Sequence, residues 1–280
     1  TLVAREWAPR GVQPSGVIGI IHGIGEHSGR YGHLASYFTG AGYRVLSYDQ
    51  RGHGLTAGSR GHVGRYEWLL DDIQCLVELM SVRSHGRPLM LYGQSLGGSL
   101  VLHYALQRRP QPAALIVTSP LLLTARRPPR WKLAAAHVMD RVMPSFSLGH
   151  GIRRDELTLD PEACQQRVQD TLMHDRVSAR MGLSMLAGGL WVLENADRLA
   201  IPTLLMHGSA DTVTSADASA RFSERAGDVC TFKLWEDKLH ELQWETDRDR
   251  IFDYAVQWIQ ETVCPTTAAS RETRQGKSDG

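Results

Sequence analysis

The sequence predicts an α/β fold, in which helices flank a mostly parallel central sheet. Short apolar runs of strand length alternate with helical patterns along most of the chain, and this alternation is typical of β-α-β units. Most of these runs are largely apolar, as in strands that are buried on both faces of a parallel sheet. The alternation stops only between residues 121 and 199, where helical patterns follow one another and predict an insertion.

The first half of the chain accounts for most of the expected sheet. Residues 2–7 predict an edge strand, and four further runs predict buried strands. These runs cover residues 17–22, 43–48, 89–92 and 114–118. The helices between them are expected at residues 31–39, 66–82 and 96–108. In the second of these helices the apolar side chains recur at intervals of three and four residues, which predicts one buried face.

The second half begins with the insertion and then returns to the sheet pattern. Residues 121–199 start with a basic, proline-rich stretch and continue with helical patterns at residues 131–142, 161–174 and 178–195. Strands at residues 203–207 and 231–236 and helices at residues 216–225 and 249–262 complete the pattern. We therefore expect three parts: a core of residues 1–120 and 200–264, a helical cap of residues 121–199, and a disordered polar tail of residues 265–280.

Composition and charge narrow the class of protein. The 42% apolar and 22% charged residues are typical of a globular protein. A formal net charge of +1 does not favour nucleic acid as a partner, and no apolar run approaches the ~18 residues of a membrane span. The four cysteines lack metal-binding spacing, so reduced thiols in a cytoplasmic protein are expected. Because the chain begins with Thr1, a trimmed N-terminus is expected, and the lack of a targeting segment carries little weight.

The segment Gly93-Gln94-Ser95-Leu96-Gly97 has the G-x-S-x-G pattern of a nucleophile elbow. The pattern is short enough to occur by chance, but here a predicted strand enters it and a predicted helix leaves it. Such an elbow exposes a serine hydroxyl, and it needs the two outer glycines because side chains there would collide with neighbouring backbone. The alternative is a serine that only caps the N-terminus of a helix. We interpret Ser95 as a nucleophile.

A nucleophilic serine needs a histidine base, and the base needs an orienting carboxylate. Asp211 and His240 follow Ser95 in the required chain order, and each comes just after a predicted strand, at the sheet edge that binds ligands. The competing acids fit a helix start, the wrong end of a strand and a solvated loop; they are Asp217, Asp197 and Asp237. His207 and His22 are assigned structural roles, and the other histidines lack the spacing of metal ligands.

The segment HGIGEHSGRYG, residues 22–32, lies between a predicted strand and a predicted helix. Its Gly23-x-Gly25 turn is compatible with a dinucleotide-binding loop, and Asp49 ends the next strand, where a ribose-binding acid would lie. However, Ser28 occupies the position of the third glycine of that pattern. The alternatives are a purely structural turn and a loop that serves the serine chemistry.

Several segments together resemble the monoacylglycerol lipase branch of the α/β-hydrolases. They are HGIGEHSGRY, YDQRGHG, GQSLGG, HGSADTVTS, HEL and, in the cap, VSARMGLSML. The resemblance extends to about Val263 and implies an α/β-hydrolase fold with the cap inserted after the sixth strand. It also implies an oxyanion hole formed by the backbone N–H groups of Ile24 and Leu96, so that the glycine turn serves an oxyanion and not a pyrophosphate. Asp49 is then expected to be a turn residue beside Arg51.

The expected activity is hydrolysis of a monoacylglycerol through an acyl-enzyme, which needs no metal or organic cofactor. Gly23, Gly25, Met185 and Leu186 are the candidate substrate-binding residues, and the two cap residues are expected either in an acyl tunnel or in the core of the cap. The stretch 131–143 is amphipathic. It predicts either a helix packed on the core or a lid that guides a small lipid or ester substrate and contacts a membrane transiently.

The resemblance leaves other functions open. Carboxylesterases, lysophospholipases, thioesterases and C–C hydrolases use the same scaffold, and fold alone does not choose among them. A hydrolase-like binding protein without activity is a more distant alternative, against which the presence of Ser95, Asp211 and His240 argues. The length of the acyl chain and the oligomeric state are left open.

Overall fold

The computed structural model describes residues 1–263 and is built around a seven-stranded sheet. The order of the strands is β1-β3-β2-β4-β5-β8-β9. Only β1 runs antiparallel to its neighbour, and all the other pairs are parallel. The strands are β1 (Ala4–Trp7), β2 (Gly16–Ile21), β3 (Tyr43–Tyr48), β4 (Leu89–Gln94), β5 (Ala114–Thr118), β8 (Thr203–Gly208) and β9 (Cys230–Trp235). The predicted mostly parallel α/β architecture is confirmed.

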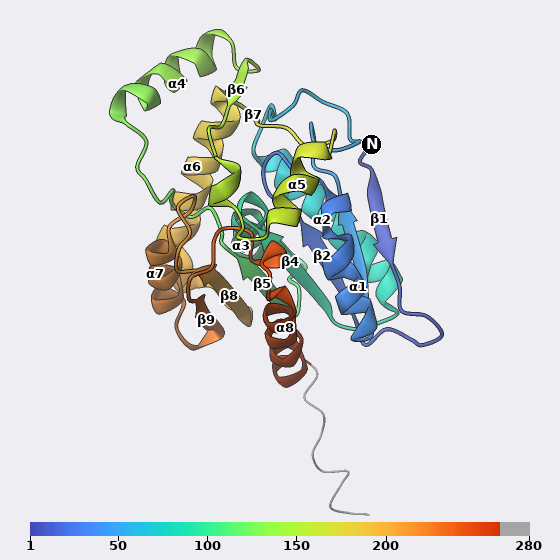
Figure 1. Ribbon diagram of the computed structural model, residues 1–280. Coiled ribbons are helices and arrows are strands. Elements are labelled where there is room, and N and C mark those ends of the chain that lie inside the picture. The colour runs from blue at the N-terminus through green and yellow to red at the C-terminus, as the bar shows by residue number, and fades with distance from the viewer. Residues whose placement is uncertain (264–280) are drawn as a thin grey trace, which may run out of the picture.

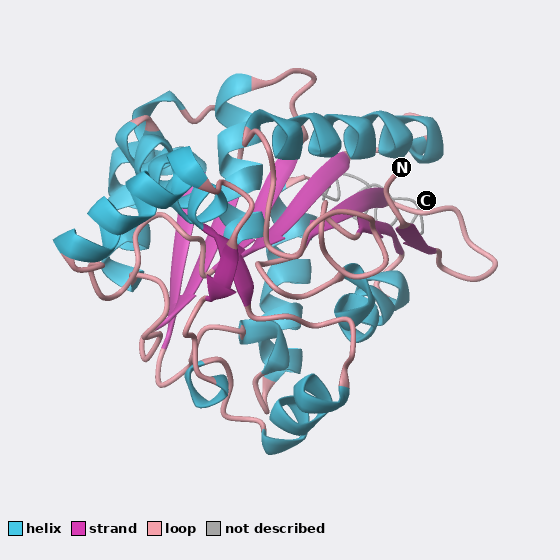
Figure 2. Ribbon diagram, turned by 90° about the horizontal axis from the view of Figure 1, so that it is seen from above, coloured by secondary structure: helices cyan, strands magenta, loops and turns pink. Residues whose placement is uncertain are grey.

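Helices cover both faces of the sheet, as Figures 1 and 2 show. On one face, α1 (Gly32–Gly40) and α8 (Arg248–Thr262) enclose a core cluster with β2, β3 and β4. On the other face, α2 (Glu67–Ser84), α3 (Leu96–Gln107) and α7 (Ala216–Ala226) enclose the larger cluster. Since β2, β5 and β8 have no exposed residue, their continuous apolar character follows from burial on both faces.

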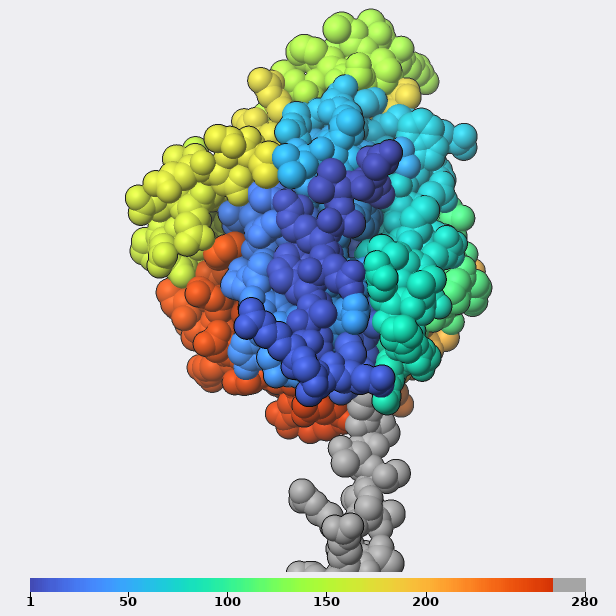
Figure 3. All heavy atoms as spheres, turned by 90° about the vertical axis from the view of Figure 1, so that its right-hand side faces the viewer, coloured from blue at the N-terminus to red at the C-terminus, as the bar shows by residue number. Residues whose placement is uncertain are grey.

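Residues 121–199, the segment predicted to be the cap, lie between β5 and β8. They form α4 (Arg130–Val142), α5 (Pro161–Gln169), α6 (Ala179–Glu194) and a short antiparallel pair, β6 (Ser147–Gly149) with β7 (Arg176–Ser178). α6 packs against both α3 and α4. In Figure 1, α4 stands furthest from the central sheet, and in Figure 3 the yellow-green part of the cap lies directly above the orange-red end of the chain.

Short 3-10 helices occur in several of the connections. They are η1 (Ser28–Tyr31), η2 (Arg154–Glu156), η3 (Ala196–Arg198), η4 (Gly227–Val229) and η5 (Leu242–Trp244). Two of them, η1 and η5, directly follow the loops after β2 and β9 that carry candidate site residues, and they mark where those loops end.

Three features of the cap differ from the sequence-based expectation. The cap follows β5, the fifth strand in chain order, and not the sixth, because the five strands expected before residue 121 are the five that the sheet contains there. The pair β6–β7 was not expected, because three-residue strands are too short to show a periodic pattern. The helix expected at residues 161–174 ends at Gln169, where Asp170 accepts a hydrogen bond from the Leu172 N–H at 2.9 Å and turns the chain.

Among residues 1–263, none of the helices combines the length and the apolar character that crossing a membrane requires. Cys75, Cys164 and Cys230 are free thiols. Cys264 and the tail expected to be disordered, residues 265–280, lie outside the described residues.

Candidate active site

Ser95 lies at a sharp turn between β4 and α3, and its backbone is strained. Its φ of 54° and ψ of −117° place it outside the regions that L-residues favour. The turn is held on both sides: the Ser95 N–H donates to Thr118 O at 3.0 Å, and Ser95 O accepts from the Leu121 N–H at 3.0 Å. This geometry is that of a nucleophile elbow, in which a strand-to-helix turn presents a serine hydroxyl.

The glycines of the elbow are needed for steric reasons, as the sequence predicts. A Cβ atom on Gly93 would lie 2.4 Å from Gly97 O, and one on Gly97 would lie 2.0 Å from Ile21 O. Both contacts involve backbone atoms, which cannot swing aside as a side chain would. Any larger residue at either position would therefore displace β2 or the first turn of α3.

Asp211 and His240, from the loops after β8 and β9, are hydrogen-bonded to each other. His240 Nδ1 lies 2.8 Å from Asp211 Oδ2. The second oxygen, Oδ1, accepts from the N–H groups of Val213 and Thr214 at 2.7 and 3.0 Å, which fixes the plane of the carboxylate. Since the ionised carboxylate can only accept, the His240 proton lies on Nδ1 and its Nε2 is available as a base.

A second imidazole shares the same carboxylate. His207 Nε2 lies 3.0 Å from Asp211 Oδ2, and its Nδ1 lies 2.8 Å from the Ser219 hydroxyl. The Thr214 hydroxyl donates to Asp211 Oδ2 at 2.8 Å. The structural role predicted for His207 is therefore more specific than expected, because its ring orients Asp211.

Electrostatics in this group favour an ionised carboxylate and a basic imidazole. Burial alone would raise the pKa of Asp211, but His240 and His207 outweigh it and hold that pKa well below its usual range. Burial alone would lower the pKa of His240, but the Asp211 carboxylate, with smaller contributions from Glu241 and Glu26, raises it above 6.5. The pair is arranged to accept a proton at His240 and to stabilise the resulting cation.

The loop after β2 places Ile24 beside Ser95. Ile24 and Ser95 line the same cavities, and the Ile24 N–H donates to no protein acceptor within residues 1–263. Leu96 begins α3, where the first N–H groups of a helix have no intrahelical acceptor. Both N–H groups therefore remain the candidates for an oxyanion hole that the resemblance implies.

The two glycines of this loop have different surroundings. A Cβ on Gly23 would lie 3.3 Å from Ser95 Cβ and 2.6 Å from Gln94 Oε1, so Gly23 allows the loop to approach the elbow. Gly25 has a φ of 77° and accepts a hydrogen bond from the His174 N–H of the cap at 2.9 Å. Gly23 lines the small cavity next to Ser95. Gly25, also expected to bind substrate, lines neither of the two cavities at Ser95 and instead contacts the cap.

Ser95 opens onto two adjoining cavities. The smaller one, about 20 Å³, lies between Ser95, His240 and Gly23. The larger one, about 450 Å³, extends beneath the cap and includes both predicted cap residues, Met185 and Leu186. Its other apolar lining residues are Ile24, Leu121, Pro128, Ile152, Val177 and Val213. An apolar cavity that begins at Ser95 suits an acyl chain.

Three other apolar residues of α6 are placed differently from Met185 and Leu186. Leu183 faces a neighbouring apolar groove of about 460 Å³ between α4 and α6, which shares Leu186 with the larger cavity. Met181 is fully buried in the core cluster, and Leu190 is exposed. The cap stretch therefore divides between cavity lining, cap core and surface.

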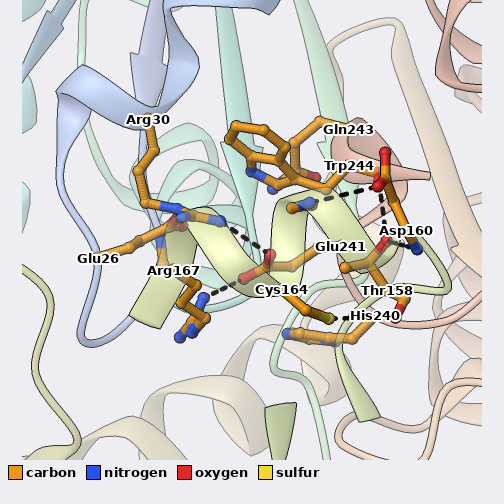
Figure 4. Close-up of polar contacts among 12 residues, drawn as sticks. Glu26, Arg30, Thr158, Asp160, Cys164, Arg167, His240, Glu241, Gln243 and Trp244 are labelled. Carbon is orange, nitrogen blue, oxygen red and sulfur yellow. Dashed lines mark hydrogen bonds and ion pairs between the residues drawn. The ribbon is translucent and has the colours of Figure 1, made fainter. Parts of the chain in front are cut away.

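Several residues near the site were missed by sequence reasoning. His150, from the cap, lines both cavities, and its buried Nε2 has no protein partner within the described residues. Arg167 and Glu241 line the small cavity and form an ion pair (Figure 4). No local pattern indicates these contacts, because their partners are distant in the chain. Only the adjacency of Glu241 to His240 was a signal that could have been used.

The competing acids have other roles. Asp197 pairs with Arg225, Asp217 is exposed in the first turn of α7, and Asp237 is exposed in a loop. The expectation that Asp49 lies beside Arg51 is wrong. Asp49 lies 3.2 Å from Arg5 and accepts hydrogen bonds from Ser28, which holds the loop there. The expected neighbour of Asp49, Arg51, instead pairs with Asp72 at 2.7 Å.

Residues 1–263 contain no group of three or more histidine, cysteine or carboxylate side chains arranged to hold a metal ion. The predicted serine chemistry does not depend on one. The residues that meet at the site are instead a serine, an imidazole–carboxylate pair and free backbone N–H groups, which is the combination that acyl transfer requires.

Comparisons with known proteins place this site in a family. A family model described as serine aminopeptidase, S33, of the Hydrolase_4 type, matches residues 12–247. The crystal structure of a monoacylglycerol lipase from Paleococcus ferrophilus is 30% identical with a TM-score of 0.85, and the match covers 94% of this chain and 99% of that one. The monoacylglycerol lipase of Mycolicibacterium smegmatis is 26% identical over 92% of each chain.

A further relative is an uncharacterised abhydrolase domain-containing protein of Dictyostelium discoideum. It is 36% identical over 266 residues, which are 94% of this chain and 28% of that protein, so the chain spans less than a third of its length. Since the family model covers most of the chain and a structure with the same fold covers nearly all of it, the chain belongs to the Hydrolase_4 (serine aminopeptidase, S33) family of α/β-hydrolases, in the branch that resembles monoacylglycerol lipases.

Proposed function

We propose that this protein is a serine ester hydrolase that cleaves monoacylglycerols into a fatty acid and glycerol. The observation that carries the proposal is that Ser95, at its strained elbow, lines the same small cavity as His240, whose Nδ1 is bound to Asp211 at 2.8 Å. The apolar cavity that starts at Ser95 and the similarity to two monoacylglycerol lipases support the choice of a lipid ester.

In the proposed reaction, His240 Nε2 takes the proton of the Ser95 hydroxyl while Ser95 Oγ attacks the ester carbonyl. The N–H groups of Ile24 and Leu96 stabilise the oxyanion, an interaction whose loss costs about 3–4 kcal/mol in other enzymes. His240 then protonates the departing glycerol oxygen. Water, activated by the same ring, attacks the acyl-enzyme and releases the fatty acid, while Asp211 stabilises the imidazolium throughout.

We propose that the larger cavity holds the acyl chain and that His150 contacts the glycerol. His150 Nδ1 accepts from the Ile152 N–H at 3.1 Å, so in the neutral ring the proton is on Nε2. That Nε2 is buried, lacks a protein partner within residues 1–263, and belongs to a side chain that lines both cavities. A glycerol hydroxyl would satisfy it.

An aminopeptidase activity, which the family description names, finds less support. A peptide amino group would need a free carboxylate near the nucleophile. The two carboxylates that line the small cavity, Glu26 and Glu241, both contact arginines. Glu156, in the larger cavity, already accepts from the Arg153 N–H at 2.9 Å and lies 3.3 Å from the Thr212 hydroxyl.

The direct test is the rate of hydrolysis of a panel of substrates: monoacylglycerols of C8 to C18, a triacylglycerol, a lysophospholipid, short p-nitrophenyl esters and an aminoacyl amide. Preference for monoacylglycerols that is lost in Ser95→Ala would support the proposal. Ser95-dependent turnover of only the short esters or only the lysophospholipid would contradict monoacylglycerol as the substrate but would still support the serine mechanism. Failure of wild-type protein to react with a fluorophosphonate probe would overturn the chemistry itself.

The contact with glycerol has its own test. His150→Phe should lower kcat/KM for monooleoylglycerol by about 3- to 10-fold, corresponding to one hydrogen bond of ~0.5–1.5 kcal/mol. The same variant should leave methyl oleate, which has the same acyl chain but no free hydroxyl, nearly unaffected. An equal loss on both esters would assign His150 to packing.

We further propose that α4 brings the site to lipid surfaces. None of its residues is buried, and Trp131, Val138 and Val142 are all more than half exposed. Val142 and Val82 offer a matched pair, since they are 70% and 71% exposed but lie on the cap and on α2. Val142→Ser should weaken co-sedimentation with phospholipid vesicles, and Val82→Ser should not. Equal binding by both variants would contradict contact through α4.

A further inference from the structure

Part of the cap is fastened to the loop that carries His240. This cap arm, residues 157–167, contacts residues 240–248 at four points. The Glu241 N–H donates to Leu157 O at 2.6 Å, and the Thr158 hydroxyl donates to Trp244 O at 2.8 Å. Two ion pairs join the same segments: Arg167–Glu241 at 2.6 Å and Arg248–Asp160 at 3.3 Å. The arm thus holds the loop directly after the proposed base.

The Arg167–Glu241 pair belongs to a buried group of four charges. Arg30 Nη2 lies 3.3 Å from the other oxygen of Glu241, and Arg30 Nε lies 3.5 Å from Glu26 Oε2. Figure 4 shows both guanidinium groups reaching Glu241. The exposed fractions of the side chains are 2% for Glu26, 4% for Arg30, 5% for Glu241 and 13% for Arg167. Two carboxylates and two guanidinium groups balance each other, which buried charges require.

The same group also holds the loop that carries Ile24. Glu26 Oε1 accepts from the Gly23 N–H at 2.6 Å and from the Tyr31 hydroxyl at 2.7 Å. A chain of contacts therefore runs from the cap through Glu241 and Arg30 to Glu26 and then to the backbone next to Ile24. Within this series of contacts, Arg167 is the residue that the cap contributes.

We propose that Arg167 is a positioning residue for the ester hydrolysis proposed above: docked on Glu241, it fixes the His240 loop and, through Arg30 and Glu26, the loop of the oxyanion donor. Without Arg167, two buried carboxylates share one guanidinium group. The uncompensated charge destabilises the buried position of Glu241 and favours movement of its loop toward water. The active geometry is then complete only when the cap arm is in place. The inference rests on the proposed function, because it concerns the same site.

The charges around His240 give the proposal an electrostatic signature. Burial alone would raise the pKa of Glu241, but Arg167 and Arg30 outweigh it and lower that pKa. The carboxylates of Asp211, Glu241 and Glu26 raise the pKa of His240. Loss of Arg167 leaves the charge on Glu241 less compensated and should raise the pKa of His240 further. Loss of the Glu241 charge should have the opposite effect. Tyr31 and Cys164 also sense Glu241, but both have pKa values raised above their usual range and stay neutral.

The test uses Arg167→Met, Arg167→Lys and Glu241→Gln, with Arg127→Met as a matched control, because Arg127 is an exposed cap arginine. The substrate is a short p-nitrophenyl ester, so that binding of a lipid plays no part. Arg167→Met should lower kcat by about 10- to 100-fold with little change in KM, as expected for misplacement of a catalytic group. The acid limb of the pH–rate profile should move to higher pH in Arg167→Met and to lower pH in Glu241→Gln. Arg167→Lys should recover part of kcat.

Two further readouts keep the outcome unambiguous. The rate of Ser95 labelling by a fluorophosphonate should fall with kcat in Arg167→Met, while the melting temperature shows whether the variant is folded. If Arg167→Met does not fold, Arg167→Lys and Glu241→Gln carry the test through their pH profiles. Wild-type labelling together with Arg167 variants that match Arg127→Met in kcat and pH profile would overturn this inference alone. Absence of labelling in the wild-type protein would instead overturn the proposed function.

Discussion

The contact between Gly25 and the cap leads to a sharp prediction for Gly25→Ala. An added Cβ would lie 2.2 Å from His174 O, and real Cβ atoms essentially never approach such an atom closer than 3.0 Å. The backbone must therefore shift by at least 3.0 − 2.2 = 0.8 Å. Because φ is 77° at this position, the alanine also adds conformational strain of about 1–2 kcal/mol.

The conformational strain and the backbone displacement predict different effects, the first on stability and the second on rate. Strain of about 1–2 kcal/mol would lower the melting temperature by only a few degrees in a protein of this size. A displacement approaching 1 Å next to Ile24, the proposed oxyanion donor, would cost on the order of 100-fold in kcat. The expected result is therefore a folded protein with kcat reduced about 100-fold and KM little changed.

The assay measures kcat, KM and the melting temperature on a short p-nitrophenyl ester, with Gly32→Ala as the control. Gly32 belongs to the same region of the chain, but a Cβ added there meets nothing within 4 Å. Wild-type kcat in Gly25→Ala, or an equal loss in Gly32→Ala, would refute the reasoning that this glycine sets the position of the oxyanion loop.

Three other predictions concern the same site. Since the pKa of His240 is raised above 6.5, kcat/KM should fall as the pH drops through a value above 6.5, and a profile flat down to pH 5 would contradict a histidine base. Asp211→Asn should lower kcat about 10⁴-fold, as in other triads, while circular dichroism should remain native; near-normal turnover would exclude Asp211 as the orienting acid. Gly97→Ala places a Cβ 2.0 Å from Ile21 O and should lower the midpoint of urea unfolding, whereas an unchanged midpoint would show that the elbow tolerates a side chain.

The local parts of the fold and site were predictable because short-range chemistry specifies them. Apolar runs buried on both faces marked the strands of the sheet, and two of them, β3 and β5, have the same bounds in the structure as in the prediction. The elbow at Ser95 was visible because glycines at two fixed positions are a steric requirement of a tight turn. The same reasoning failed for β6 and β7, whose three residues each carry no periodic signal.

By itself, the sequence determined the fold class, the turn at Ser95 and the chain order of the candidate serine, acid and base, because each depends on neighbouring residues. Only the tertiary structure decided which distant groups meet. Asp211 is shared by His207 and His240, and Glu241 finds Arg167 at a separation of 74 residues. Such pairings depend on how the cap arm packs against the loops at the edge of the sheet. Charge and hydrogen-bonding capacity are properties of single residues, but the partner that satisfies them is chosen by the packing of the whole chain.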